Sequence, residues 1–431
     1  MTERLLRGRV FGFHRAPEGI DDREAYVYEE DGAVLVGDGI VEAAGTFEEL
    51  KGRALEIIDH RPNLILPGFI DPHIHFPQMQ VIGSYGAQLL EWLNRYTFPA
   101  ETRFGDAGHA ERIARLFFDE LLRNGTTTAV AFCSVHKASA EAYFREAVRR
   151  NLCMIGGKVL MDRNAPDGLR DTPQSGYDDT RALIADWHGQ GRVRYAITPR
   201  FAITSTPEQM ETAQALAAEY PDLHIQTHLS ENGAEIAYAA KLYPDAKDYL
   251  DIYDHYGLLG RNSLMGHSIH LSQRERARMA ETGTVAVHCP TSNLFIGSGL
   301  FDLAALEDAG VRTAIATDVG GGTSYSMLKT LDEAYKIQQL QNRSVDPLSA
   351  FYWATLGNAE ALSLADRIGS LAAGSDADII VLDSHATPAM SVRMETVETL
   401  PEELFVLQTL GDDRAVVAAY VAGELAGPAD N

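Results

Sequence analysis

The chain has 431 residues, which is too many for one ordinary small domain and enough for a barrel of about 250 residues with a companion domain. Its formal net charge of −24 repels polyanions and argues against binding to nucleic acid or to an anionic membrane. Three scattered cysteines, Cys133, Cys153 and Cys289, form no C-x-x-C pair, so we expect no disulfide framework and a reducing, cytoplasmic location. No stretch approaches the roughly 18 apolar residues of a membrane span, and the first residues lack the apolar core of a signal peptide.

Short apolar runs of strand type alternate with helical patterns through the middle of the chain. Between residues 111 and 125, Ile113, Leu116 and Phe117 are expected on one helical face, and Gly125 ends the helix. Eight strand-like runs occupy residues 64–75, 125–134, 154–162, 193–201, 223–230, 263–270, 284–293 and 311–318. Eight strands that alternate with helices predict an α/β fold, a (β/α)8 barrel of the TIM type.

The two ends of the chain do not follow this alternation. Residues 25–60, 368–384 and 414–425 carry short strand-like pieces separated by turn signals. We therefore predict a small β-sandwich domain built from both termini, residues 1–65 and 367–431, with the barrel of residues 66–366 inserted between them.

Two histidines separated by one residue end the first strand of the predicted barrel, in the sequence LPGFIDPHIHF. Positions i and i+2 of a strand point to the same face, so His73 and His75 aim together. They lie at the C-terminal end of the strand, where barrels of this type hold their active sites. Asp71 shares their parity, and we expect it to orient one imidazole through a hydrogen bond. Taken alone, the pair also fits two ordinary polar residues at a strand end.

Three other strand-like runs end in residues of the same chemical kind. His228 ends the fifth run, His267 the sixth and Asp318 the eighth. Each alone fits a core histidine or a helix cap, but barrel geometry brings them to one mouth with the first pair. We predict a metal site that begins with His73 and His75 and is completed from strands five and eight. Neutral imidazoles with one carboxylate suit Zn²⁺, with Fe²⁺ as the second choice.

The segments PGFIDPHIH, HLSEN, GH and TD, in this order, resemble the amidohydrolase superfamily. Within it, several segments are similar to the guanine deaminase family: LLEWLNRYTFPAE (89–101), NGTTTA (124–129), ITPRF (197–201), HCPTSN (288–293) and TDVGGGTSYSML (317–328). The resemblance spans the barrel and is weaker over the first 60 residues and over residues 385–405.

This resemblance implies a role for each matching residue. It implies that one zinc ion per chain is bound by His73, His75, His228 and Asp318. It implies that Glu231, His267 and Asp318 are catalytic, with Glu231 as the proton shuttle. The substrate contacts that it implies are Gln78, Arg200, Phe201, His228, His267 and Asp318. A single metal is expected because Lys158 lies in the third strand, whereas the lysine that bridges two metals in some relatives ends the fourth.

The activity that the resemblance implies is hydrolytic deamination of guanine to xanthine and ammonia by a metal-activated water, in a homodimer. The same chemistry on 8-oxoguanine or a pterin stays open, as does a non-catalytic scaffold, although a scaffold does not need Glu231. For two of these residues an ordinary structural role is the alternative: Arg200 could pair with a local carboxylate, and Glu231 could be a solvated loop residue. Residues 89–101, with three aromatic side chains, are expected to cover the site, and core or interface packing is the alternative.

Overall fold

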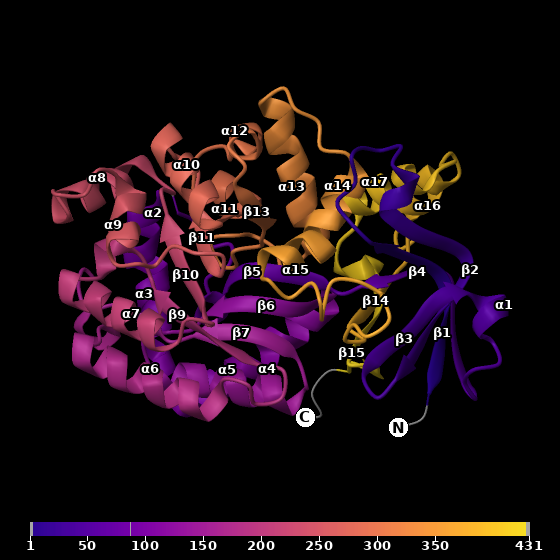
Figure 1. Ribbon diagram of the computed structural model, residues 1–431, viewed down its shortest axis with the longest axis horizontal. Helices are drawn as coiled ribbons and strands as arrows, with labels where there is room; N and C mark the ends of the chain where they lie inside the picture. Colours follow the sequence, from indigo (N-terminus) through magenta and orange to yellow (C-terminus); the bar gives the residue numbers. More distant parts are fainter. Residues whose placement is uncertain (1–2, 87, 428–431) are drawn as a thin grey trace.

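The structure is a computed structural model that describes residues 3–86 and 88–427. Residues 1–2 and 428–431, which the sequence assigned to the terminal β domain, lie outside the described residues. The chain forms a barrel at one end of the molecule and a separate sheet at the other (Figure 1). Within the described residues, no helix is long and apolar enough to cross a membrane.

Eight parallel strands form the barrel, as the sequence predicted. In hydrogen-bonded order they are β5 (Phe69–His75), β6 (Thr126–Phe132), β7 (Cys153–Gly157), β9 (Arg194–Pro199), β10 (His224–Leu229), β11 (Ser263–His267), β12 (Val285–His288) and β13 (Arg312–Ile315). The short β8 (Val159–Leu160) pairs with β9. Two backbone hydrogen bonds close the barrel, from Asp318 N to His73 O at 2.9 Å and from His75 N to Val319 O at 2.7 Å.

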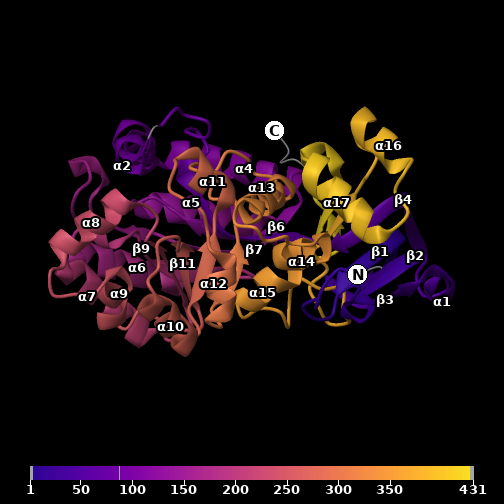
Figure 2. The ribbon, with the colours of Figure 1, turned by 90° about the horizontal axis from the view of Figure 1, so that it is seen from above.

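Helices follow the strands and cover the outside of the barrel (Figure 2). They are α4 (Ala107–Arg123), α5 (Lys137–Arg149), α6 (Pro173–Trp187), α7 (Pro207–Glu219), α8 (Gly233–Leu242), α9 (Tyr249–His255), α10 (Gln273–Thr282), α11 (Pro290–Phe295), α12 (Leu303–Asp308), α13 (Met327–Leu340), α14 (Pro347–Tyr352) and α15 (Asn358–Ala361). The α4 helix buries Ile113 and Phe117, whereas Leu116, which was expected on the same helical face, is 42% exposed.

Short helical pieces make up much of the remaining barrel loops. They include α2 (Leu89–Trp92), α3 (Phe98–Thr102) and the π-helical turns η3 (Leu93–Thr97) and η7 (Trp353–Gly357). The 3-10 turns are η1 (Arg23–Ala25), η2 (Phe76–Gln78), η4 (Arg103–Gly105), η5 (Asp167–Leu169), η6 (Ala202–Thr204) and η8 (Asp413–Ala415).

Strands from both termini form one mixed sheet, which confirms that the two ends of the chain meet in one domain. Its order is β16 (Glu424–Leu425), β15 (Val416–Val421), β14 (Ile379–Leu382), β4 (Glu56–Pro67), β1 (Arg4–Phe13), β2 (Tyr26–Gly37) and β3 (Ile40–Thr46). All seven strands are joined in a single sheet, where the sequence suggested a sandwich. Register shifts in β1 and β4 mark bulges, at which strands bend and twist more strongly.

The junction between the two parts is short. Strand β4 ends at Pro67 and β5 begins at Phe69, so the sequence run 64–75 belongs to two sheets. A small helix, α1 (Phe47–Leu50), packs on β2. Two further helices, α16 (Pro388–Met394) and α17 (Leu400–Leu410), lie within residues 367–431, which the sequence assigned to the β domain. Because α17 packs on α13 and α14, the C-terminal segment touches both parts of the fold. The exact domain boundaries, 66 and 366, stay a prediction.

Candidate active site

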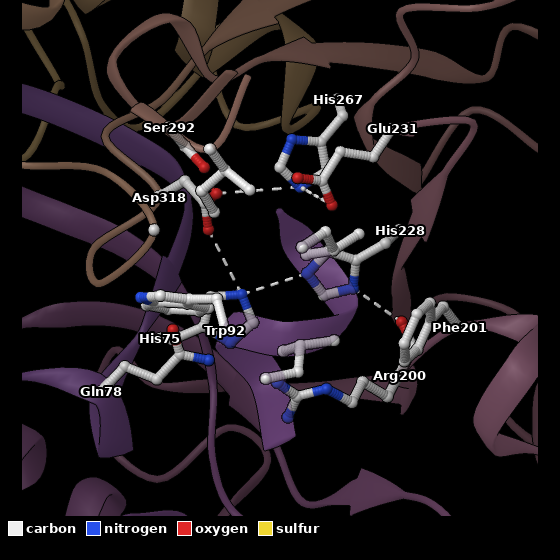
Figure 3. A pocket seen from close by; sticks show the side chains of 14 residues that line it. His75, Gln78, Trp92, Arg200, Phe201, His228, Glu231, His267, Ser292 and Asp318 are labelled. Carbon is white, nitrogen blue, oxygen red and sulfur yellow. Dashed lines mark hydrogen bonds and ion pairs between the residues drawn. The ribbon is translucent and has the colours of Figure 1, made fainter. Parts of the chain in front are cut away.

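The strand ends bring the four predicted metal ligands together. His73 and His75 come from β5, His228 from β10, and Asp318 follows β13. Their ligand atoms all lie within 4.8 Å of one another, and all four residues are buried. Figure 3 shows His75, His228 and Asp318 around one space, with His75 Nε2 at 3.1 Å from His228 Nε2 and 3.3 Å from Asp318 Oδ1. This convergence follows from barrel geometry, because parallel strands end at one mouth.

The chemistry of these donors fits a metal ion. Both ring nitrogens of His73 and Nδ1 of His75 are buried and have no hydrogen-bond partner among the described residues. The Nδ1 of His228 lies 2.7 Å from the carbonyl of Arg200, which it can reach only as a donor, so Nε2 keeps its lone pair. Burial lowers the pKa of His75 to about 4 and that of His228 well below its usual range. Neutral imidazoles with a carboxylate form a typical divalent-metal site.

Asp318 supplies the negative charge of this cluster. Burial opposes its ionisation, but the contacts with His73 and His75 hold the pKa of this carboxyl well below its usual range. The His73 Nε2 to Asp318 Oδ1 distance is 3.4 Å. The carboxylate therefore stays charged at neutral pH, as a metal ligand must.

Two further groups that can exchange protons face the metal-ligand cluster. His267 Nε2 lies 3.4 Å from Glu231 Oε2 and 3.7 Å from Asp318 Oδ2. Its Nδ1 is 2.9 Å from Oδ1 of Asn293, which orients the ring. Burial, followed by the negative charge of Asp318, raises the pKa of Glu231 to about 8, while the hydroxyl of Ser298 donates to Oε1 at 3.0 Å. Glu231 is thus buried and poised to exchange a proton near neutral pH, unlike a solvated loop carboxylate.

A pocket opens directly above these groups. It encloses about 360 Å³, counting the part that is open to solvent. Its lining consists of His75, Gln78, Leu89, Trp92, Leu93, Arg200, Phe201, His228, Glu231, His267, Ser292, Ile296, Asp318 and Gly321. All the predicted substrate contacts therefore line one cavity together with three of the predicted metal ligands.

Residues 89–101 form part of the pocket wall, through α2, η3 and α3. Leu89, Trp92 and Leu93 line the cavity, and the indole nitrogen of Trp92 donates to the carbonyl of Ser84 at 3.2 Å. Phe98 is buried instead, with its ring 5.6 Å from the guanidinium carbon of Arg200. The segment therefore serves as both cover and core.

The structure corrects the expected role of Asp71. Its carboxylate accepts from the backbone N–H of His73 at 3.3 Å and of Thr317 at 3.1 Å, and from the Thr317 hydroxyl. Among the described residues it bonds to no imidazole, because its side chain points across the seam of the barrel. Asp71 therefore ties β5 to the segment after β13 and acts on the backbone that carries the ligands.

Other residues of the site were missed or underestimated from the sequence. Asn293 and Ser298 orient His267 and Glu231, yet only the HCPTSN segment hinted at the former. Glu101 binds both Gln78 and Arg200, and nothing beyond its membership of the segment 89–101 marked it. Cys289, which the sequence did not mark as a site residue, has its sulfur within 4.8 Å of ligand atoms of His73, His267 and Asp318. Burial raises the pKa of this thiol, which keeps it protonated.

The backbone is strained where the catalytic candidates sit. Ser230, His267, Ser268 and Asp318 have φ values of 49°, 69°, 50° and 50°. Side chains other than glycine rarely adopt this left-handed region, and such residues gather at functional sites. These turns at the ends of β10, β11 and β13 direct the side chains into the pocket.

Comparison with known proteins agrees with this geometry. The chain is 47% identical to a guanine deaminase of Escherichia coli over 98% of both chains. Its structure matches that of a guanine deaminase from Bradyrhizobium japonicum with a TM-score of 0.95 and 37% identity over the full length of both. It matches a guanine deaminase from C. acetobutylicum with bound guanine in the active site with a TM-score of 0.87 and 29% identity, over 99% of this chain and 100% of that one. The sequence profile of the Amidohydrolase family matches residues 64–426, so this chain belongs to the amidohydrolase family.

Proposed function

We propose that this protein hydrolyses guanine to xanthine and ammonia with one zinc ion bound by His73, His75, His228 and Asp318. The observation that carries the proposal is the placement of Glu231 and His267 between this donor cluster and a pocket walled by Gln78, Arg200 and Phe201. Relatives named guanine deaminases, one of them with guanine in its active site, support this choice of substrate.

Each site residue has a separate role in the proposed reaction. When bound, zinc activates water for attack at neutral pH. Glu231 takes a proton from the attacking water and delivers it to the ring nitrogen beside the carbon that bears the amine. Asp318 and His267 stabilise the tetrahedral centre while a proton moves to the amine, which leaves as ammonia. Arg200 and Gln78 hold the polar edge of the purine, and Phe201 packs on its ring.

A panel of substrates tests the proposal. Metal-loaded protein is incubated with guanine, 8-oxoguanine and pterin, and released ammonia is measured. We expect guanine to give the highest kcat/KM, since a site built to hydrogen-bond polar edges rejects mismatched analogues strongly. A higher kcat/KM for 8-oxoguanine or pterin would change the substrate, and no ammonia from any of them would favour a non-catalytic scaffold.

Glu231→Gln provides the matched catalytic variant. The amide keeps the hydrogen bond with Ser298 but cannot shuttle a proton, so kcat should fall by about 10²–10⁴. Zinc content, measured by mass spectrometry of the metal, should remain at one ion per chain. A variant with wild-type kcat would remove Glu231 from the reaction.

We also propose that the protein is a homodimer in the cytoplasm. Its three cysteines are free and buried, which is consistent with a reducing compartment. The dimer rests on the family resemblance, and light scattering of the purified protein would test it directly.

A further inference from the structure

One buried carboxylate connects the two side chains that are proposed to hydrogen-bond the purine. Glu101 Oε1 accepts from Gln78 Nε2 at 2.9 Å and from Arg200 Nη1 at 2.9 Å, while Oε2 accepts from the same Nη1 at 2.7 Å. All three residues are at most 2% exposed. The Ser134 hydroxyl donates to the backbone carbonyl of Glu101 at 3.2 Å, which fixes α3 beneath the pocket.

Glu101 sets the orientation of the Arg200 guanidinium. Both contacts with the carboxylate use Nη1, and no hydrogen bond from Nε or Nη2 to the part of the chain that the structure describes is present. The ring of Phe98 lies 5.6 Å from the guanidinium carbon. A planar group held at one nitrogen presents its remaining donors in a fixed direction, and Arg200 lines the pocket (Figure 3).

Glu101 also decides how the amide of Gln78 is turned. Gln78 Oε1 accepts from the backbone N–H of Gly320 at 3.2 Å, and Nε2 donates to Glu101. A carboxylate can only accept and a backbone N–H can only donate, so the reversed amide would lose both bonds. With the oxygen of Gln78 already engaged, this amide and Arg200 together offer donors to the pocket.

The same carboxylate balances the charge of this wall. Arg200 is a permanent cation, and a buried cation without its partner attracts any anion within reach. The ion pair with Glu101 leaves a wall that is rich in donors but close to neutral. Such a wall suits a neutral heterocycle with an acceptor edge and gives an anionic one little extra attraction.

We propose that Glu101 is a positioning and specificity-determining residue that makes this pocket select neutral purines over anionic ones. The inference rests on the proposed function, which makes a purine the ligand of the pocket. Glu101 acts through Arg200 and Gln78, so its effect should appear in which ligand binds, while proton transfer by Glu231 stays intact.

The test compares guanine with urate, an anionic purine that carries no exocyclic amine and therefore acts only as an inhibitor. In Glu101→Gln we expect kcat/KM for guanine to fall at least tenfold, mainly through KM. The inhibition constant of urate should fall at least tenfold, because Arg200 is then free to pair with the anion. Glu91→Gln is the matched control, since Glu91 lies on the same segment and is exposed; both constants should stay within twofold.

Two further variants keep the test decisive. In Glu101→Gln/Arg200→Met the gain in urate binding should disappear, because the cation that causes it is gone. Glu101→Asp keeps the charge but shortens the reach, so guanine should bind more weakly without any tightening of urate; this variant also serves if Glu101→Gln does not fold. Metal content and thermal unfolding are checked for each protein.

The proposal is overturned if loss of the charge weakens guanine and urate alike, if neither constant changes, or if urate tightens in Glu101→Asp. Failure of the proposed function looks different, since the wild type would then release no ammonia from guanine. In that case, calorimetric binding of guanine and urate to the wild type and to Glu101→Gln still measures the same selectivity.

Discussion

Buried histidines of this barrel serve two different purposes, and position along the strand separates them. His224 and His228 lie on the same strand, β10, and both are buried. His228 lies next to the end of the strand, at the pocket, whereas His224 begins the strand, with Nε2 at 2.8 Å from the carbonyl of Leu362. His224 is therefore a neutral donor that stabilises the end of the barrel opposite the pocket.

His224 should make the stability of the protein sensitive to acid. Burial lowers its pKa to about 4, whereas an exposed histidine in the unfolded chain titrates near 6.5. On acidification the unfolded state takes up its proton first, so stability is full above about pH 6.5 and is lost as the pH falls towards 4. Between pH 7.5 and 5 this residue should account for about 2 kcal/mol.

His224→Gln isolates this contribution, because an amide can donate to Leu362 and does not titrate. The free energy of unfolding from urea titrations at pH 7.5 and 5 should drop less in this variant than in the wild type. His255→Gln, at an exposed position, should behave as the wild type. An equal drop in all three proteins would show that His224 has no part in the acid sensitivity.

At the scale of single residues, the sequence could identify those groups whose position is set by their own strand. His73, His228 and Asp318 are recognisable because each comes at the end of an apolar run. Glu101 is not recognisable in this way, since its partners Gln78 and Arg200 lie 23 and 99 residues away. Only the folded barrel brings these side chains together.

Among the elements, the amide of Asn358 strengthens the seam between the first and last barrel strands, beside the backbone bonds that close it. Asn358, at the start of α15, donates through Nδ2 to the carbonyls of Ile70 at 2.7 Å and Ile315 at 2.8 Å. Its Oδ1 accepts from the N–H of Ile315 at 3.0 Å. A single side chain thus stands in for part of the ladder between β5 and β13.

Replacing this amide should loosen the seam. Asn358→Ala removes three buried hydrogen bonds, each worth about 1 kcal/mol, and leaves backbone groups without partners, so the free energy of unfolding should fall by about 3 kcal/mol. Urea denaturation of the metal-loaded protein measures this change. Asn262→Ala is the control, because Asn262 makes one bond of 3.5 Å near the surface and should cost well under about 1 kcal/mol. Equal stability of the two variants would mean that Asn358 does not hold the seam.

Element types followed from the sequence better than element ends did. The apolar run 64–75 looks continuous, but it divides at Gly68, where a side chain would lie 2.1 Å from the Thr127 hydroxyl. The run 284–293 stops being a strand at His288, and α11 begins at Pro290. In both cases the neighbouring chain decides where a strand changes partner or ends, and periodicity does not contain that information.

For the molecule as a whole, the metal should act as a clamp between distant parts of the barrel. Its proposed ligands come from β5, β10 and the segment after β13, so one ion links β10 to two strands with which it does not pair. Removal of zinc by a chelator should abolish ammonia release and lower the unfolding temperature by roughly 3 °C, since a bound ion at a hundredfold excess over Kd stabilises by about 2.7 kcal/mol.

Differential scanning calorimetry with and without chelator measures this shift, and added zinc should reverse it. A His73→Ala/His75→Ala variant, which lacks half of the ligand set, should show no shift with the chelator. An unchanged unfolding temperature in the wild type, after metal analysis has proved the ion absent, would contradict the clamp.

The division into a barrel and a domain from both termini was visible in the sequence, because alternating and non-alternating patterns differ. Strand β1 was not visible in the sequence, because its arginines interrupt the apolar pattern of a strand that lies inside the sheet. Arg9, for example, pairs with Glu403 of α17 at 2.6 Å, a partner 394 residues away. Contacts between the two ends of a chain leave no local trace in the sequence.

The short junction at Gly68 has a consequence for anyone who trims this protein. Strand β4 is hydrogen-bonded to β1 and β14 on its two sides. Only Gly68 separates its end from β5, the strand that carries His73 and His75. An excised barrel that starts at Phe69 would place these two imidazoles on a frayed first strand with nothing to anchor it. The sheet built from both termini therefore anchors the strand that carries these two ligands, and we expect the two parts to fold only together.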